Sequence, residues 1–266
     1  MLKFFIDGFK INAIFTLFSR ITGFIRDIFF AYFLGAGIHS DIFFIASKVP
    51  NLFRRITAEG AFTSSFLPVY SGLLNGKNSK NAEQFSKLIF IILLILITAL
   101  TIILQIFMNE LILLIAPGFQ SNHALLNQII TLSRFTILFL PIISIVALFG
   151  AMLNASGRFA PFAFTPIILN ISLIVACLFI SENMAIKSFP LSIALPISGL
   201  IQLFFICFFS FKYSLISKEF FNYFKIKKQI ILKFSKLLNL TLKRFIPAML
   251  SGGIFQINIL VDTLLA

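Results

Sequence analysis

Charged residues are scarce in this 266-residue chain, at 12% of the sequence, which is about half the share found in soluble domains. Hydrophobic residues account for 59%, and the mean hydropathy is +1.03. So few polar side chains could not cover a water-soluble globule of this size. This excludes a soluble enzyme, a soluble nucleic-acid-binding protein and a disordered chain. We therefore predict an all-α polytopic membrane protein.

Cysteine and histidine are rare, with two residues of each. Cys177 and Cys207 lie within apolar stretches, so we interpret them as apolar core residues. His39 and His123 are too far apart in the sequence to form a metal-ligand motif. No nucleophile–base pair or metal-ligand cluster is recognisable, so we expect no enzymatic activity and no cofactor.

Acidic residues are outnumbered: nine Asp and Glu stand against 22 Lys and Arg, which gives a net charge of +13. In a soluble chain this excess would suggest a nucleic-acid partner. In a chain this apolar it is typical of cytoplasmic loops that follow the positive-inside rule. We therefore expect membrane lipids, and no nucleic acid, around this protein.

Seven apolar stretches are long enough to cross a bilayer, which takes about 20 helical residues. Four of them contain no charge, one of which, 135–157, lies between Arg134 and Arg158, whereas the first two contain several charges and are separated by a break at Gly35-Ala36-Gly37. The predicted spans cover residues 11–34, 42–70, 88–109, 135–157, 159–181, 188–211 and 245–266.

The basic residues outside these spans fall almost entirely on one side of the membrane. Fifteen belong to the amino terminus and to alternate connections, whereas the other side has Lys187 alone, with Arg134 at a span edge. The positive-inside rule then predicts a cytoplasmic N-terminus. Nine of the fifteen lie in 212–244, which we predict to be a cytoplasmic linker with a basic amphipathic helix on the inner leaflet.

The first two predicted spans contain charged side chains where such groups are costly. Polar residues recur in each span at every third or fourth position, so they share one helix face. They are Asn12, Thr16, Ser19, Gly23 and Asp27 in the first span and Lys48, Asn51, Arg55, Glu59 and Thr63 in the second, with Arg20, Arg26 and Arg54 beside the two faces. Two facing polar stripes predict a water-filled cavity. Asn154 and Asn170 could line it as well, or could bond between helices.

Arginine dominates the charge inside these two spans. Four arginines and one lysine stand against two acidic residues there, although lysine is more than twice as common as arginine in the whole chain. Arginine presents a planar fork that suits phosphate or carboxylate. We therefore predict a cavity for an anionic, phosphate-bearing solute. Structural ion pairs with Asp27 and Glu59 are the alternative, but they would neutralise only part of this charge.

Several motifs in the chain are recognisable. They are SRITGFIRD at 19–27, GAG at 35–37, DIFF at 41–44, PNLFRRITAEGAF at 50–62, APGF at 116–119, the region of Leu153 and Asn154, and PIILNIS at 166–172. Together they resemble the lipid II flippase family MurJ, also called MviN. The resemblance extends over essentially the whole chain, and the motif at 50–62 is its most specific part.

The resemblance implies a bundle of fourteen helices built from two six-helix halves around a central cavity. It also implies a function, the movement of lipid II, the undecaprenyl-pyrophosphate-linked peptidoglycan precursor, to the outer leaflet of the bacterial inner membrane by alternating access. The matching positions for arginines that engage the pyrophosphate are Arg20, Arg26 and Arg54, with Arg55 adjacent. Asp27, Asp41 and Glu59 match acidic positions of the cavity or its gating, and Ser19 and Asn170 match polar positions near the outward gate.

The chain is short for this family, because it ends just after the seventh predicted span. It would then be a fragment, or one product of a split gene whose second lobe is supplied separately. Three other functions are left open: a flippase for another polyprenyl-linked oligosaccharide, a multidrug exporter, and a membrane scaffold with structural ion pairs. The arginine surplus argues against an exporter of cationic drugs, which would need an acidic cavity.

Overall fold

The computed structural model describes residues 2–54, 62–74, 79–180, 183–184, 186–221 and 228–265. Every regular element in these ranges is helical, which confirms the predicted all-α class. The helices are α1 (Leu2–Phe33), α2 (Ile38–Arg54), α3 (Phe62–Leu74), α4 (Ser79–Ile106), α5 (Met108–Ile115), α6 (His123–Thr136), α7 (Phe139–Ala155), α8 (Phe159–Cys177), α9 (Phe189–Lys212) and α10 (Lys228–Leu265), with a short 3-10 turn at Pro117–Phe119.

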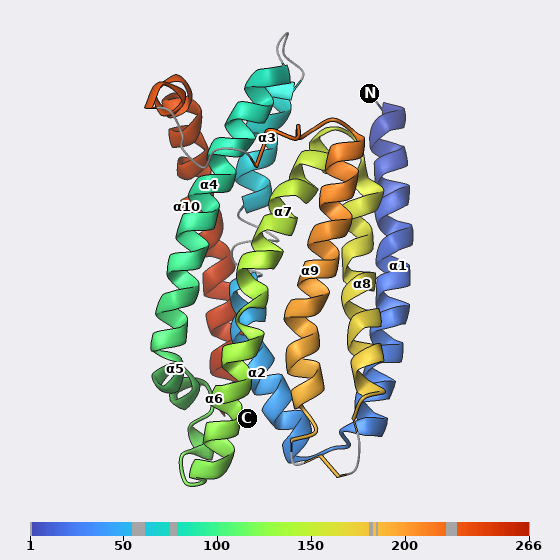
Figure 1. The fold of residues 1–266 in the computed structure, drawn as a ribbon, viewed down its shortest axis with the longest axis vertical. Helices are drawn as coiled ribbons and strands as arrows, with labels where there is room; N and C mark the ends of the chain where they lie inside the picture. The colour runs from blue at the N-terminus through green and yellow to red at the C-terminus, as the bar shows by residue number, and fades with distance from the viewer. Residues whose placement is uncertain are drawn as a thin grey trace.

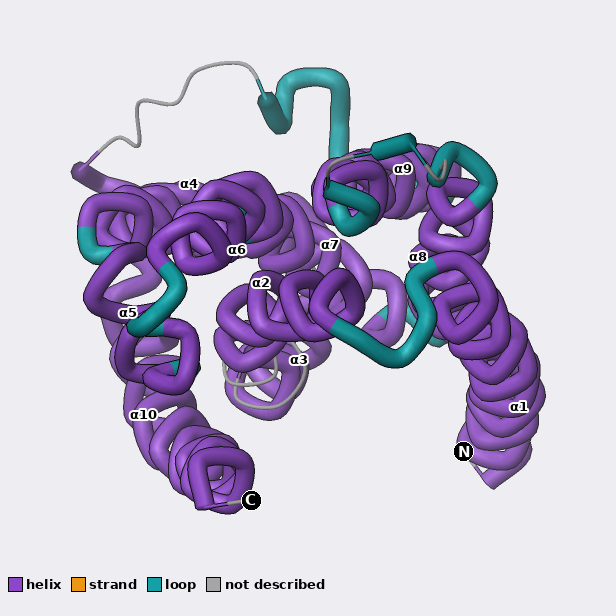
Figure 2. Tube along the Cα trace, turned by 90° about the horizontal axis from the view of Figure 1, so that it is seen from below, coloured by secondary structure: helices purple, strands orange, loops and turns teal. Residues whose placement is uncertain are grey.

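The long helices stand side by side along the longest axis of the molecule (Figure 1). Helix α1 packs on α8, α8 on α9, α9 on α7, and α7 on α4. Helices α3 and α10 lie behind this row and pack on each other. Figure 2, seen from one end of the bundle, places α1 and α10 at its two flanks with α2 and α3 between them.

Within the described residues, four helical stretches are long and apolar enough to cross a membrane. They are Lys80–Ile106, His123–Ala155, Phe159–Cys177 and Phe189–Lys212. Large apolar side chains point outward from the bundle: Phe24 of α1 is 68% exposed, Leu96 of α4 is 61% exposed and Phe204 of α9 is 73% exposed. Such a surface suits lipid rather than water. The chain is therefore membrane-embedded, while the total of seven spans stays a prediction.

The second predicted span, 42–70, corresponds to two shorter helices. Helix α2 includes Pro50 and α3 includes Pro68. Residues 55–61 between the two helices lie outside the described residues, and so do the predicted site residues Arg55 and Glu59.

Helix α10 is continuous where the sequence predicted the end of a surface linker followed by a separate seventh span. Its Phe234 is 3% exposed and packs against Phe85 of α4, with ring centroids 5.7 Å apart. Lys233 Nζ donates to Oδ1 of Asn81 at 2.7 Å and to Oε1 of Gln84 at 3.0 Å. Part of the apolar face of this segment is therefore buried against the bundle. An apolar stripe of helical period looks the same in sequence whether it covers a lipid surface or another helix.

The connections that are rich in basic residues lie at one end of the bundle. This end includes the start of α1, the start of α4, the α7–α8 turn and the end of α9 (Figure 1). Gly157, with a φ of +79°, ends α7 in the left-handed conformation that favours glycine. The guanidinium of Arg158 then lies 4.5 Å from the ring centroid of Tyr213. Nearby, Lys87 Nζ donates to the carbonyl oxygen of Glu219 at 3.1 Å. These contacts tie the α9–α10 connection to the rest of this end.

Candidate substrate cavity

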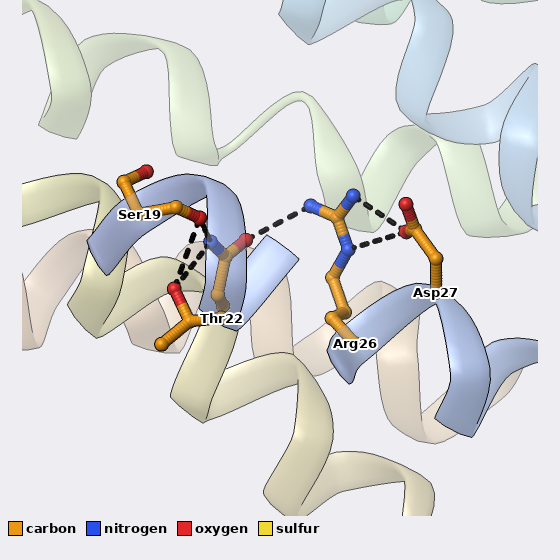
Figure 3. A network of polar contacts seen from close by, with 5 residues as sticks. Ser19, Thr22, Arg26 and Asp27 are labelled. Carbon is orange, nitrogen blue, oxygen red and sulfur yellow. Dashed lines mark hydrogen bonds and ion pairs between the residues drawn. The ribbon is translucent and has the colours of Figure 1, made fainter. Parts of the chain in front are cut away.

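A polar network joins α1 to α8 (Figure 3). Arg26 Nη1 donates to Oδ1 of Asn170 at 2.9 Å. Asn170 Nδ2 donates to the carbonyl oxygen of Ser19 at 3.0 Å and to Oγ1 of Thr22 at 3.1 Å. Asn170 is 5% exposed, so these bonds are sheltered from solvent. The Asn170 amide thus fixes two turns of α1 and orients the arginine on the second of them.

The same arginine is paired with its neighbour on α1. Arg26 Nε and Nη2 both donate to Oδ1 of Asp27, at 3.0 and 2.7 Å. The Arg26 side chain is 27% exposed and the Asp27 side chain 62% exposed. A guanidinium carries five N–H donors, and the contacts with Asp27 and Asn170 use three of them. Arg26 therefore keeps donors for a further acceptor while one partner faces solvent.

The wall formed by α8 contains a proline that shapes the local hydrogen bonding. Pro166 has no N–H, so it cannot bond to the carbonyl of Phe162 one turn earlier. Thr165 Oγ1 donates to that carbonyl oxygen at 2.9 Å instead. The hydroxyl replaces the missing helix bond and lets a proline-containing helix line a polar cavity.

A cavity of about 410 Å³ lies beside this network, among α1, α2, α7, α8 and α9. Part of its wall is apolar and includes Phe139, Ile143 and Leu169. Its polar wall includes Asn12, Thr16, Ser19, Arg54, Asn154 and Gln202. The predicted stripe on α1 thus contributes Asn12, Thr16 and Ser19 to one wall, and Arg54 reaches the same space from α2.

Two amides of this wall have a buried atom without a hydrogen-bond partner in the described part of the chain: Oδ1 of Asn154 and Nε2 of Gln202. Gln202 is 2% exposed, whereas Asn154 is half-buried. Sequence reasoning missed Gln202. The available signal was an amide in the middle of an otherwise apolar, uncharged span.

The other predicted site residues lie apart from this wall. Arg20 is exposed on α1 and is not among the residues that line the cavity. Asp41 is exposed in the first turn of α2, where its negative charge interacts favourably with the positive end of the helix dipole. In the ranges that the structure describes, no three His, Cys, Asp or Glu side chains come together as a metal site requires.

Comparisons with known proteins agree with this architecture. A family model described as "Lipid II flippase MurJ" matches residues 30–266. A probable lipid II flippase MurJ of Rickettsia prowazekii is 40% identical over 196 residues, which cover 73% of this chain and 38% of that protein. A second probable lipid II flippase MurJ, from Buchnera aphidicola subsp. Acyrthosiphon pisum, is 34% identical over 252 residues, which cover 95% of this chain and 47% of that protein.

A solved structure of a lipid II flippase MurJ in an inward closed conformation superposes with a TM-score of 0.72 at 28% identity. The match covers 94% of this chain and 49% of that one. The chain thus spans half or less of the length of these relatives.

Proposed function

This chain belongs to the lipid II flippase MurJ family, and we propose that it forms the first lobe, with the first helix of the second, of a flippase for lipid II. The protein would lie in the bacterial inner membrane with its N-terminus in the cytoplasm, as the one-sided distribution of basic residues supports. Lipid II and the surrounding membrane lipids are its partners in this proposal. Alternating access then requires a second lobe that packs against this one.

The observation on which the proposal depends most is the pair of hydrogen-bond partners that hold Arg26. Its guanidinium is held by a buried amide, that of Asn170, and by an exposed carboxylate, that of Asp27. Water can solvate the Asp27 carboxylate when it leaves, so the exchange of this partner for a substrate anion costs little. The remaining N–H donors and those freed from Asp27 can then bind phosphate oxygens as a planar fork.

Arg54 supplies a second cation in the same region, because it lines the cavity that Ser19 also lines. Two guanidinium groups suit a doubly charged pyrophosphate better than a neutral sugar or a cationic drug. Arg20 lies one helical turn from the cavity-lining Thr16, but it is exposed and does not itself line the cavity. We assign it to the entry of the anion rather than to the cavity wall.

The proposal also gives the α1–α8 network a role in the transport cycle. Neutralisation of Arg26 by the substrate weakens the Arg26–Asp27 pair, whereas the bonds from Asn170 to Ser19 and Thr22 do not involve the arginine. Asp27 is the neighbour of Arg26 on the same helix, so this exchange does not release α1 from α8, which Arg26 still contacts through Asn170. Helices α1 and α8 would therefore move together when the cavity changes the side on which it opens.

Complementation tests the proposal. The protein, as its gene encodes it, is expressed in bacteria depleted of their own lipid II flippase, in parallel with an Arg26→Ala variant and a matched Arg134→Ala control. Arg134 is exposed on α6 and does not line the cavity. We expect growth with the wild-type protein and the control, and lysis with Arg26→Ala at equal expression. Normal growth with Arg26→Ala would contradict the proposal that Arg26 binds the pyrophosphate.

A further inference from the structure

The 410 Å³ cavity among α1, α2, α7, α8 and α9 contains polar groups that the arginine network does not use. Nε2 of Gln202 and Oδ1 of Asn154 belong to different helices, α9 and α7, and both lack a hydrogen-bond partner among the described residues. Gln202 is almost fully buried, at 2% exposure. A buried polar group without a partner is costly. Two such groups in one cavity therefore indicate that a polar ligand forms the missing hydrogen bonds.

The chemistry of the two amides restricts what that group is. A primary amide carries both a donor and an acceptor, and it carries no charge. Its natural partner is a group that also offers both, such as another amide or a hydroxyl. Thr16 and Asn12 add further uncharged polar groups to the same wall. The cavity volume lies within the range of small-molecule pockets.

The position of the cavity relates it to the arginine site. Ser19 lines the cavity, and its carbonyl oxygen accepts the bond from Asn170, which in turn holds Arg26. Ser19 and Arg26 are seven residues apart on α1, which is about 10 Å along a helix. A group attached directly to a pyrophosphate bound at Arg26 and Arg54 would reach this space.

We propose that the cavity lined by Gln202 and Asn154 is a subsite for the amide- and hydroxyl-bearing sugar next to the pyrophosphate of the substrate. The proposal rests on the proposed function, because it places the sugar by reference to the pyrophosphate. It assigns charge recognition to the arginines of α1 and α2, and recognition of the sugar to the amides of α7 and α9. The subsite thereby distinguishes a sugar-bearing polyprenyl pyrophosphate from the bare carrier lipid.

The test compares two lipids that differ only in the sugar-containing head group: lipid II and undecaprenyl pyrophosphate. Affinities are measured on the purified protein in detergent, for the wild type, Gln202→Leu, Asn154→Leu and Arg26→Ala. Leucine fills nearly the same volume as either amide, so the variants keep the packing. Gln105→Leu is the matched control, because Gln105 lies on α4 outside this cavity and its Nε2 already donates to the carbonyl oxygen of Arg134.

We expect Gln202→Leu and Asn154→Leu each to weaken the binding of lipid II about tenfold, as the loss of a buried hydrogen bond does, and to leave the binding of undecaprenyl pyrophosphate unchanged. Gln105→Leu should change neither affinity. Equal weakening of both lipids, or of neither, would overturn the subsite. Arg26→Ala reports separately on the proposed function, because it should weaken the binding of both lipids. If it weakens the binding of neither, Arg26 does not bind the pyrophosphate, whatever the amide variants show.

Discussion

Arg26 of α1 and Asn170 of α8, which are 144 residues apart in the sequence, are joined by a 2.9 Å hydrogen bond from Nη1 to Oδ1. Asn170 is buried, and its Nδ2 also bonds to two groups on α1. Asp27, the other partner of Arg26, is mostly exposed. The arginine therefore has one fixed partner and one exchangeable partner. This arrangement positions a cation for an incoming anion without leaving it unpaired beforehand.

Replacement of Asn170 by alanine should weaken both the fold and the site. The substitution removes the acceptor of Arg26 and the donor to Ser19 and Thr22, so the free energy of unfolding should fall by about 1–3 kcal/mol. Affinity for undecaprenyl pyrophosphate should fall several-fold, because the guanidinium loses its orientation. Thermal unfolding in detergent and lipid-binding titrations measure the two effects.

Asn170→Asp separates orientation from charge. The new carboxylate still accepts from Arg26 but also neutralises it, and it cannot donate to the Ser19 carbonyl. We expect this variant to bind undecaprenyl pyrophosphate more weakly than Asn170→Ala does. Wild-type affinity in Asn170→Asp would show that the phosphate is held elsewhere.

The first part of α10 should contribute to the stability of the bundle. Phe234 is buried against Phe85, so Phe234→Ala should lower the free energy of unfolding by about 3 kcal/mol. Leu232, on the same helix, is 64% exposed, and Leu232→Ala should have little effect. Equal, small effects of the two variants in thermal unfolding would support the surface-linker interpretation that the sequence suggested.

Helices α7 and α8 approach closely at Gly150. A Cβ added there would overlap the ring of Phe162, whereas a Cβ at Gly72 of α3 would meet no atom within 4 Å. Gly150→Ala should therefore destabilise the protein by about 1–3 kcal/mol, and Gly72→Ala should leave it unchanged or slightly more stable. The midpoint of thermal unfolding distinguishes the two variants. A neutral Gly150→Ala would contradict the observed packing of α7 on α8.

The orientation in the membrane can be measured with single cysteines, after Cys177 and Cys207 are replaced by alanine. Ser121, in the connection between α5 and α6, and Lys218, in the connection between α9 and α10, are both exposed. These two connections lie at opposite ends of the bundle (Figure 1). A membrane-impermeant maleimide added to intact cells should label Ser121→Cys and spare Lys218→Cys until the cells are opened. The reverse pattern would overturn the cytoplasmic assignment of the N-terminus.

Much of the fold can be predicted from the sequence, because the length of an apolar run and the positions of charged residues along the chain indicate where a membrane-spanning helix forms. Uncharged runs such as 88–109 and 188–211 overlap the membrane-length helices α4 and α9. What an amphipathic helix face packs against cannot be predicted in this way. The stripe around Phe234 has the same period on a membrane surface as on α4, and only the tertiary structure distinguishes the two.

The site was partly predictable for a similar reason. The three- and four-residue spacing of Asn12, Thr16 and Ser19 placed them on one face, and they do line one cavity. The contribution of Gln202 depends on how α9 is rotated against α7 and α8, which no spacing within a single helix reveals. The roles of Arg26, Arg54 and Asn170 in substrate binding stay predictions.

The most direct test of the central claim is the rate at which lipid II reaches the outer leaflet in cells depleted of their own flippase. With the wild-type protein or Arg134→Ala, newly made lipid II should become accessible to a reagent that cannot cross the membrane. With Arg26→Ala it should accumulate in the inner leaflet, at no more than about a tenth of the wild-type rate of exposure, which corresponds to the loss of about 1.4 kcal/mol of binding. Exposure of lipid II by Arg26→Ala at the wild-type rate would contradict the account.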